Sequence, residues 1–290
     1  MATLTDWCEG ARIRTLPASV APVILGTGAA GSIGGFHAGR AILAALVAIF
    51  FQIGVNFAND YSDGIRGTDE FRSGPPRLTG GGKVPPRTVK LLAFAHFAAA
   101  CICGLLLVMW SGQYWLLALG AGAVAAAWFY TGGTHPYGYI GLGELFVMVF
   151  FGYVATVGTT YTQSSHAPWT AWVGATGVGL IACALLMINN IRDIPTDIQA
   201  GKRTLAVRLG DQWARYSWCG LMLVALICGC GIAVRYPVGW VVIIVMAWSG
   251  VLARRYVLAG ARGRDLIVVL RDTGLIELGY ALTLAVALLV

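Results

Sequence analysis

The chain has 290 residues, of which 58% are hydrophobic and only 11% are charged, whereas about a quarter of the residues of a soluble domain are charged. The composition therefore excludes an ordinary water-soluble globular protein. The net charge of +7 reflects basic residues that gather in the loops between apolar segments, which is a membrane-topology pattern, and we expect no nucleic-acid partner. The seven cysteines are odd in number and include no C-x-x-C pair, which argues against a disulfide or metal framework.

Apolar segments of about 20 residues follow one another along the whole chain. Lipid offers the backbone no hydrogen-bonding partner, so a membrane-spanning segment must be a helix or part of a closed barrel, and continuous hydrophobicity selects helices. We therefore predict a single all-α, polytopic membrane domain over residues 1–290, in which the first helix is retained rather than removed as a signal peptide. The nine predicted spans are about 15–34, 40–59, 89–110, 114–130, 142–160, 171–191, 216–233, 237–252 and 273–290.

The basic residues predict the orientation of these spans. Of the 20 lysines and arginines, 18 lie in the N-terminal tail and in three loops, at about 60–90, 192–215 and 253–272. Only Arg40 and Arg235 fall on the opposite side. Because basic residues concentrate on the cytoplasmic side of a membrane, we expect the N-terminus and the acidic loops to be cytoplasmic.

The second apolar segment ends in an acidic stretch, "NFANDYSDGIRGTDE", residues 56–70. Asn56, Asp60 and Asp63 stand at i, i+4 and i+7, which places them on one face if the helix continues that far. The glycines that follow are expected to end the helix and to leave Asp69 in the loop. Carboxylates so close together repel one another, so the sequence indicates that a cation is bound there.

The sixth segment ends in a similar stretch, "NNIRDIPTDIQAGKRT", residues 189–204. Asn189, Asp193 and Asp197 recur at i, i+4 and i+8. Pro195 lies between the two aspartates and is expected to kink or end the helix, because proline removes one helical hydrogen bond.

Four spans separate the two acidic stretches, and an even number of crossings returns the chain to the same face. We therefore expect both clusters to converge on one cavity. Carboxylate and amide oxygens suit Mg²⁺, which binds few protein ligands and leaves places for phosphate oxygens. The basic residues that follow each cluster are expected to hold the rest of a diphosphate; they are Arg72, Arg77, Lys83, Lys202 and Arg203.

Other readings of these features are weaker. "GTGAAG" at 26–31 lies inside an apolar span with no preceding strand, which argues against a dinucleotide fingerprint. "DYSDGIRG" begins like the signature of CDP-alcohol phosphotransferases, but Gly67-Thr68 stands where that signature requires Ala-Arg. A membrane transporter is the alternative from another class, and we expect the middle of every span to lack charged residues, which disfavours it. The simplest alternative is that these acids lie at solvated helix ends and balance the charge of the basic loops.

At the two acidic stretches the sequence resembles the UbiA superfamily of intramembrane prenyltransferases, and within it the branch that prenylates 1,4-dihydroxy-2-naphthoate. The resemblance covers nearly the whole chain. Its motifs are "RIRTLPAS" at 12–19, "NDYSDGIRGTD" at 59–69, "RLTGGGKVPPRTV" at 77–89, "YTGGTHPYGYIGLGE" at 130–144 and "NNIRDIPTDIQAGKRTLAVRLG" at 189–210. One departure is Gly67, which occupies the final aspartate position of the first motif, so either Asp63 or Asp69 completes that metal site.

The resemblance implies a fold of nine helices around a central cavity that is open to lipid. It implies two Mg²⁺ ions, one held by Asp60 and Asp63 and the other by Asp193 and Asp197, with Asn56 and Asn189 orienting the cluster. The implied reaction transfers a polyprenyl group from polyprenyl diphosphate to 1,4-dihydroxy-2-naphthoate with loss of CO₂, at the plasma membrane of a bacterium. Another aromatic acceptor, such as 4-hydroxybenzoate, homogentisate or haem, remains the alternative within the superfamily.

Further side chains are candidates for roles in that reaction. Tyr130 and Tyr137 lie in the loop after the fourth span and are expected to shield and stabilise an allylic cation. Arg12 or Arg14 is expected to bind the carboxylate of the aromatic acid. Glu144 opens an apolar span, and an acid near membrane depth is a functional candidate by default.

Overall fold

A computed structural model describes residues 2–67 and 77–290, and all the regular elements within these ranges are helices. The membrane helices and their extensions are α2 (Leu16–Gly31), α3 (Ala38–Ile65), α4 (Pro86–Ser111), α5 (Leu116–Phe129), α6 (Gly143–Val147), α7 (Ala155–Ser164), α8 (Trp169–Gln199), α9 (Leu205–Ala233), α10 (Val242–Leu252) and α11 (Asp265–Leu289). Short elements are α1 (Leu4–Ala11), the 3₁₀ turns Ile13–Thr15, Tyr137–Ile140 and Pro237–Val241, and the π-helical turns Met148–Val154 and Ala253–Val257.

The predicted all-α membrane fold is confirmed. In the described part of the chain, seven helical segments are long and apolar enough to span a membrane; α6 and α7 join through a π-helical turn into one of them, Gly143–Ser164, and α10 belongs to another, Pro237–Val257. The remaining two predicted spans correspond to α2, with 16 residues, and α5, with 14, which are shorter. The protein is thus a multi-pass membrane protein.

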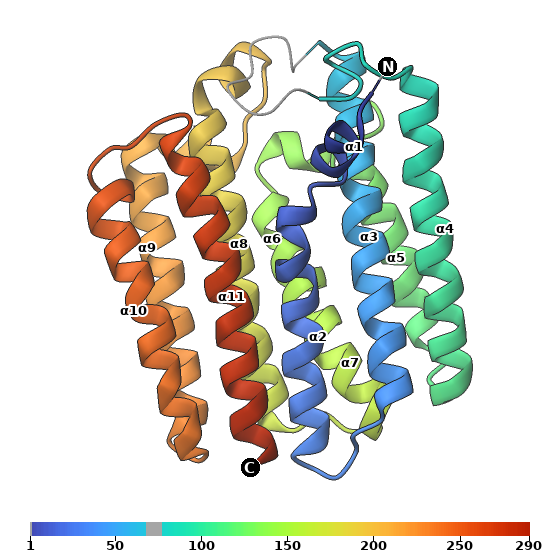
Figure 1. The fold of residues 1–290 in the computed structure, drawn as a ribbon, viewed down its shortest axis with the longest axis vertical. Coiled ribbons are helices and arrows are strands. Elements are labelled where there is room, and N and C mark those ends of the chain that lie inside the picture. Colours follow the sequence, from blue (N-terminus) through green and yellow to red (C-terminus); the bar gives the residue numbers. More distant parts are fainter. Residues whose placement is uncertain (1, 68–76) are drawn as a thin grey trace.

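Long helices run side by side along the longest axis of the molecule, and the two termini lie at opposite ends (Figure 1). The ends of α3 and α8 that carry the acidic stretches lie at the same end as the N-terminus and the short helix α1 (Figure 1). The expectation that an even number of crossings brings the two stretches to one face is therefore met. This end of the bundle holds the candidate site.

Small residues let the central helices approach closely. In the contact between α2 and α11, an ideal Cβ atom built on Gly28 would lie only 2.5 Å from Cα of Ala285. A side chain larger than hydrogen therefore has no room there, which is how small residues serve helix association in lipid. Where α8 meets α11, Gly177 lies directly beside the buried Tyr280 ring.

Two details differ from the sequence-based expectations. Of the two outcomes expected at Pro195, a kink or a helix end, the second does not occur, since α8 continues through it to Gln199; transmembrane helices tolerate proline where other groups satisfy the freed backbone positions. The middle of α11 is not free of charge-bearing residues. This helix begins at Asp265, earlier than predicted, so Glu277 lies near its centre and is fully buried.

Candidate active site

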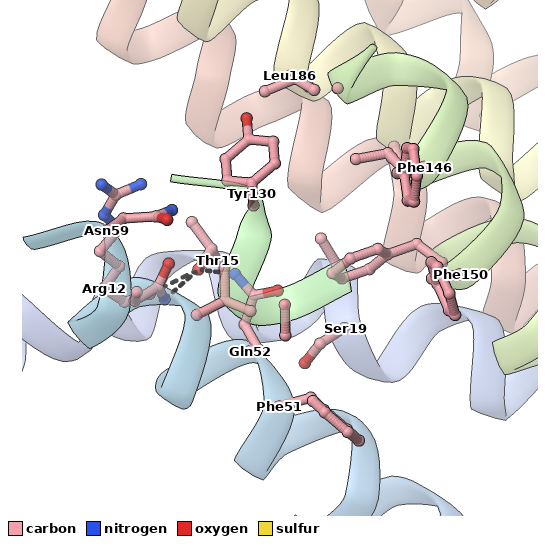
Figure 2. A pocket seen from close by; sticks show the side chains of 18 of the residues that line it. Arg12, Thr15, Ser19, Phe51, Gln52, Asn59, Tyr130, Phe146, Phe150 and Leu186 are labelled. Atoms are coloured by element: carbon pink, nitrogen blue, oxygen red, sulfur yellow. Dashed lines mark hydrogen bonds between the residues drawn. The ribbon is translucent and has the colours of Figure 1, made fainter. Parts of the chain in front are cut away.

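A cavity of about 820 Å³ opens between the helices. Its polar part is lined by side chains of both acidic stretches, among them Asp63, Asp193 and Asp197. Its other part is apolar and is lined by α2, α3, α4, α5 and α7 through residues such as Val23, Val47 and Leu119. Figure 2 shows Tyr130 between Arg12 and Asn59 on one side and the aromatic rings of Phe146 and Phe150 on the other. The cavity therefore has a charged end and an apolar end.

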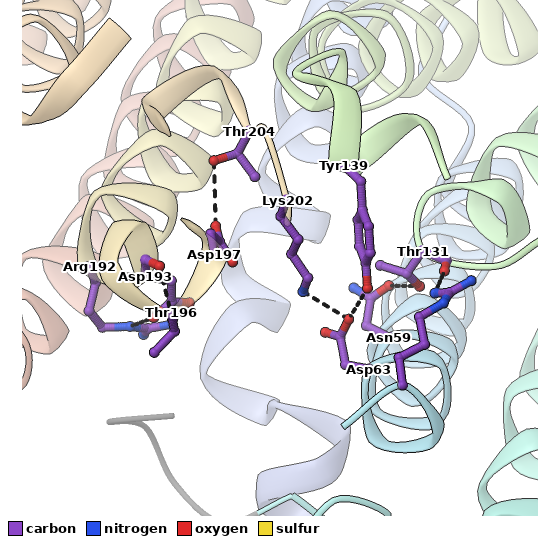
Figure 3. Close-up of polar contacts among 11 residues, drawn as sticks. Asn59, Asp63, Thr131, Tyr139, Arg192, Asp193, Thr196, Asp197, Lys202 and Thr204 are labelled. Atoms are coloured by element: carbon purple, nitrogen blue, oxygen red, sulfur yellow. Dashed lines mark hydrogen bonds and ion pairs between the residues drawn. The ribbon is translucent and has the colours of Figure 1, made fainter. Parts of the chain in front are cut away.

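The first acidic stretch presents Asp63 to the cavity. Oδ1 of Asp63 accepts hydrogen bonds from the Tyr139 hydroxyl at 2.6 Å and from the Lys202 ammonium at 3.0 Å (Figure 3). One turn earlier, Asn59 also lines the cavity, and its Oδ1 accepts a hydrogen bond of 2.8 Å from Thr131. Asn59 and Asp63 therefore form an N-x-x-x-D pair on one face of α3.

Asp60 has a different environment from its neighbour. Its side chain is fully buried, and its two oxygens accept hydrogen bonds from the backbone N–H groups of Leu78 at 2.9 Å and Thr79 at 2.8 Å. Asp60 does not line the cavity. The expectation that Asp60 is a metal ligand is therefore not supported by the geometry, because its carboxylate faces the backbone of residues 78 and 79 and not the cavity.

The second acidic stretch lines the cavity with all three of its predicted residues, Asn189, Asp193 and Asp197. The guanidinium of Arg192 donates to both oxygens of Asp193, at 2.7 and 2.6 Å, and to Oδ1 of Asn189 at 2.8 Å. One turn further on, Asp197 accepts a hydrogen bond of 3.4 Å from the hydroxyl of Thr204. A bidentate arginine fixes the orientation of Asp193.

Only some of the predicted basic residues reach the cavity. Arg12, Arg14, Arg77 and Lys202 line it. Lys83 does not, and its ammonium forms an ion pair with Asp6 on α1 instead. Arg203 also lies outside the lining; its backbone N–H donates to the carbonyl oxygen of Tyr139. Asp69 and Arg72 lie outside the described residues.

In this site the Lys202 amine is charged and the Tyr139 phenol is neutral. Burial alone favours the neutral amine, but the neighbouring Asp63 carboxylate outweighs it and raises the pKa of Lys202 above its ordinary value. Burial and the Asp63 carboxylate raise the pKa of Tyr139 to about 12. At neutral pH the polar part of the cavity therefore holds a protonated lysine and a protonated phenol, and both donate to Asp63.

Aromatic rings form one wall of the cavity. Tyr130 and Tyr137 meet edge to face with 5.5 Å between ring centroids, and Tyr137 stacks on Phe146 at 3.9 Å. Phe150 continues the row, stacked on Phe146 with centroids 6.2 Å apart. Both predicted tyrosines therefore belong to a wall of π-faces of the kind that stabilises a cation.

The N-terminal segment is fixed against α3 beside the cavity. Nδ2 of Asn56 donates to the carbonyl oxygen of Ala11 at 2.9 Å, and Gln52 donates to the hydroxyl of Thr15 at 3.0 Å. These bonds hold the turn that carries Arg12 and Arg14. Asn56 thus anchors a chain segment, whereas Asn59 takes the place in the acidic face that was expected for Asn56.

Glu144 is buried and does not line the cavity. Its Oε1 accepts a hydrogen bond of 3.1 Å from Nδ2 of Asn190, which does line it.

Sequence reasoning missed several residues of this site, namely Asn59, Tyr139, Asn190 and Arg192. A signal for the first was present, since Asn59-x-x-x-Asp63 repeats the spelling Asn189-x-x-x-Asp193. Tyr139 and Asn190 reach their partners through packing between segments far apart in the chain. Arg192 instead contacts residues one and three positions away on its own helix.

The donors fit magnesium. Among the described residues no three His, Cys, Asp or Glu side chains form a ready-made metal cluster, and Mg²⁺ characteristically takes one or two carboxylates and completes its shell with phosphate oxygens and water. Asp63 on α3 and Asp193 and Asp197 on α8 provide carboxylates of that kind on opposite walls of one cavity (Figure 3).

Comparison with known proteins identifies the family. The model of the UbiA prenyltransferase family matches residues 19–268. Over 289 residues the chain is 48% identical to 1,4-dihydroxy-2-naphthoate octaprenyltransferase of Mycobacterium tuberculosis, covering 99% of this chain and 98% of that protein. It is 39% identical over 228 residues to the protein of the same name in Escherichia coli, covering 77% and 74% of the two chains.

Solved structures agree on the fold. A UbiA homologue from Archaeoglobus fulgidus bound to DMAPP and Mg²⁺ matches with a TM-score of 0.67 at 16% identity, covering 98% of this chain and 99% of that chain. A UbiA homologue from Aeropyrum pernix matches with a TM-score of 0.68 at 17% identity, covering 93% and 96%. The matched sequence and the matched fold lead to one conclusion: the chain belongs to the UbiA prenyltransferase family.

Proposed function

We propose that this protein transfers a polyprenyl group from polyprenyl diphosphate to 1,4-dihydroxy-2-naphthoate, releasing diphosphate and CO₂. The observation that carries the proposal is the single cavity in which acids and bases meet at one end and apolar side chains line the other. An amphiphile with a diphosphate head and a hydrocarbon tail matches both ends. The choice of acceptor rests on the relatives that carry that name.

The polar end of the cavity suits the diphosphate. Lys202 and Arg77 line it and supply cations for phosphate oxygens. As the allylic C–O bond breaks, negative charge grows on the leaving diphosphate, and fixed cations in a site shielded from water stabilise that charge.

We assign Asp63, Asp193 and Asp197 as the protein ligands of Mg²⁺, with Asn59 and Asn189 beside them. When bound, the metal supplies Lewis-acid neutralisation of the diphosphate. Two ions, one for each acidic stretch, match the placement of these carboxylates on two helices.

The apolar end suits the prenyl chain and the cation that forms from it. Tyr130, Tyr137 and Phe146 offer π-faces that stabilise positive charge, and the apolar lining excludes water that would otherwise capture the cation. The ring carbon that bears the carboxylate then bonds to the prenyl carbon. The bond to CO₂ breaks, and its electron pair restores the aromatic ring. We assign Arg12 and Arg14 to the carboxylate of the acceptor before it is lost.

A transfer assay tests this function. Purified protein in detergent is given Mg²⁺, a polyprenyl diphosphate and, in separate reactions, 1,4-dihydroxy-2-naphthoate, 4-hydroxybenzoate and homogentisate, and product masses are measured. We expect a product only with dihydroxynaphthoate, lighter by CO₂ than the simple adduct. A product with another acid would replace the proposed acceptor, and no product with any acceptor would overturn the proposed reaction.

We further propose that the polar end of the bundle faces the cytoplasm of a bacterial cell. The support is the distribution of basic residues in the sequence, of which 18 of 20 fall in the N-terminal tail and in the stretches at about 60–90, 192–215 and 253–272, since basic residues concentrate on the cytoplasmic side. The termini lie at opposite ends of the molecule (Figure 1), so a C-terminal alkaline phosphatase fusion should be active and a C-terminal green fluorescent protein fusion dark. The reverse pattern would invert the orientation.

A further inference from the structure

Two side chains beside the aromatic wall form a buried pair that the proposed reaction does not yet use. Nδ2 of Asn190 donates a hydrogen bond of 3.1 Å to Oε1 of Glu144. Asn190 is 8% exposed and lines the cavity, whereas Glu144 is 9% exposed and lies behind it. Oε2 of Glu144 is buried and has no hydrogen-bond partner among the described residues. Burying an acid with an unpaired oxygen costs free energy, so we expect Glu144 to have a function here.

The pair lies next to the place where an aromatic ring would stack. Gly143, the residue before Glu144, packs so closely on Tyr130 that a Cβ atom on it would lie 3.4 Å from Cε2 of that ring. Tyr130 in turn meets Tyr137 edge to face. A flat substrate held against this wall would therefore have Asn190 at its edge.

The chemistry of an amide explains what Glu144 does for Asn190. An asparagine side chain has a donating NH₂ end and an accepting oxygen end, and rotation by half a turn exchanges them. A carboxylate only accepts, so it holds the NH₂ end toward itself. No protein donor to Oδ1 of Asn190 is found within residues 2–67 and 77–290, and this oxygen is thus left as an acceptor for a ligand.

Two other asparagines of the cavity, Asn59 and Asn189, have the opposite polarity. Oδ1 of Asn59 accepts from Thr131 and Oδ1 of Asn189 accepts from Arg192, so protein donors already occupy the accepting ends of both. Asn190 and Asn56 instead have their donating ends engaged by the protein, Asn56 by the carbonyl oxygen of Ala11. Of these two, Asn190 is the one that donates to a carboxyl group.

We propose that Asn190 accepts a hydrogen bond from a ring hydroxyl of the aromatic acceptor, and that Glu144 is a positioning residue that keeps the Asn190 amide in the accepting orientation. This assignment rests on the proposed function, since it supposes a hydroxylated aromatic acid in the cavity. It makes the pair a determinant of acceptor recognition, not of diphosphate binding.

Steady-state kinetics with each substrate varied separately test the proposal. Asn190→Leu removes the accepting oxygen, and Glu144→Leu removes its orienting partner without changing a residue that lines the cavity. We expect each to raise KM for dihydroxynaphthoate about tenfold, the equivalent of one hydrogen bond, and to leave KM for the prenyl diphosphate within about twofold. Glu277→Gln alters an acid that is fully buried elsewhere and serves as the control, with both KM values unchanged.

A paired exchange separates orientation from mere structural support. Asn190→Asp faces the carboxylate of Glu144 with a second acid and should lose acceptor affinity. In the double variant Glu144→Gln with Asn190→Asp, the amide is at position 144 and the carboxylate at position 190. The amide can only donate to this carboxylate, and the second carboxylate oxygen again faces the cavity as an acceptor. We expect KM for the acceptor to return to within about threefold of the wild type. Failure of the double variant to recover, with thermal stability like that of the wild type, would overturn the role of Glu144.

Substrate analogues identify the contact. Monomethyl ethers of dihydroxynaphthoate at each hydroxyl lack one donor, and one of them should be a poorer substrate than the parent for the wild type but not for Asn190→Leu. Equal discrimination by both proteins would contradict the contact. A wild type that prenylates no dihydroxynaphthoate would instead refute the proposed function, and this outcome is distinct from a wild type that does so while Asn190→Leu keeps its acceptor KM.

Discussion

Lys202 donates a hydrogen bond of 3.0 Å to Asp63 across 139 residues of sequence. Asp63 belongs to the first acidic stretch and Lys202 to the second, so this one contact joins the two stretches. Both side chains are largely buried, with 13% of Lys202 and 9% of Asp63 exposed. The pair also balances part of the negative charge that the cavity collects from α3 and α8.

The carboxylates assigned to magnesium should be indispensable. Asp63→Asn, Asp193→Asn and Asp197→Asn are each expected to lower kcat/KM by at least about a hundredfold, because each removes a carboxylate that would hold Mg²⁺ at the leaving diphosphate. Asp265→Asn makes the same change at an exposed position at the start of α11 and should leave the rate unaltered. Normal rates in any of the three cavity variants would remove that residue from the metal site.

Asp60 should behave as a structural residue. Asp60→Asn replaces one accepting oxygen by an NH₂ group that faces a backbone N–H, and we expect a loss of about 1–3 kcal/mol in the free energy of unfolding. The activity that remains should need the same Mg²⁺ concentration as the wild type, measured by titration of the transfer rate. A raised Mg²⁺ requirement with unchanged thermal stability would make Asp60 a ligand after all.

Lys202 should contribute to diphosphate binding. Lys202→Gln removes a buried ammonium next to Asp63, and loss of a charge-assisted hydrogen bond of about 1.5–3 kcal/mol corresponds to a rise in KM for the prenyl diphosphate of roughly tenfold to a hundredfold. Lys90→Gln, at the start of α4 and outside the cavity lining, is the matched control. An unchanged KM in Lys202→Gln would show that the lysine serves only its neighbour.

The close approach of α2 and α11 should tolerate no added methyl group. Gly28→Ala brings a Cβ atom into contact with the backbone of Ala285 and is expected to cost about 1–3 kcal/mol, as overpacking of a core does. Gly231→Ala places its methyl group in open space on α9 and should be neutral or slightly stabilising, since alanine favours helix. Thermal unfolding in detergent compares the two, and equal midpoints would contradict the tight packing described.

Much of the fold could be predicted because hydrophobicity is a local property. Continuous apolar runs gave the helices, and an even number of crossings placed residues 56–70 and 189–204 at the same end. The start of α11 was missed because Asp265 and the following charges resemble a loop, although the helix extends through them.

The site was predicted less completely, for reasons of tertiary packing. Asn56 with Asp60 and Asn59 with Asp63 are equally good i, i+4 pairs on a helix, and periodicity cannot choose between them. Tertiary contacts distinguish the two pairs: the backbone N–H groups of Leu78 and Thr79 donate to the Asp60 carboxylate, which leaves Asp63 to face the cavity. Similarly, nothing near Lys83 in the sequence indicates that Asp6 pairs with it.

The central claim is that the two acidic stretches hold one diphosphate together. Its most direct test is calorimetric binding of a non-reactive prenyl thiodiphosphate, with and without Mg²⁺, to the wild type, Asp63→Asn, Asp193→Asn and the double variant. Because both residues would serve one shared site, each single change should abolish most of the Mg²⁺-dependent affinity, and the double change should add little. Losses that simply add, or a single variant that keeps its full Mg²⁺-dependent affinity, would contradict the shared site.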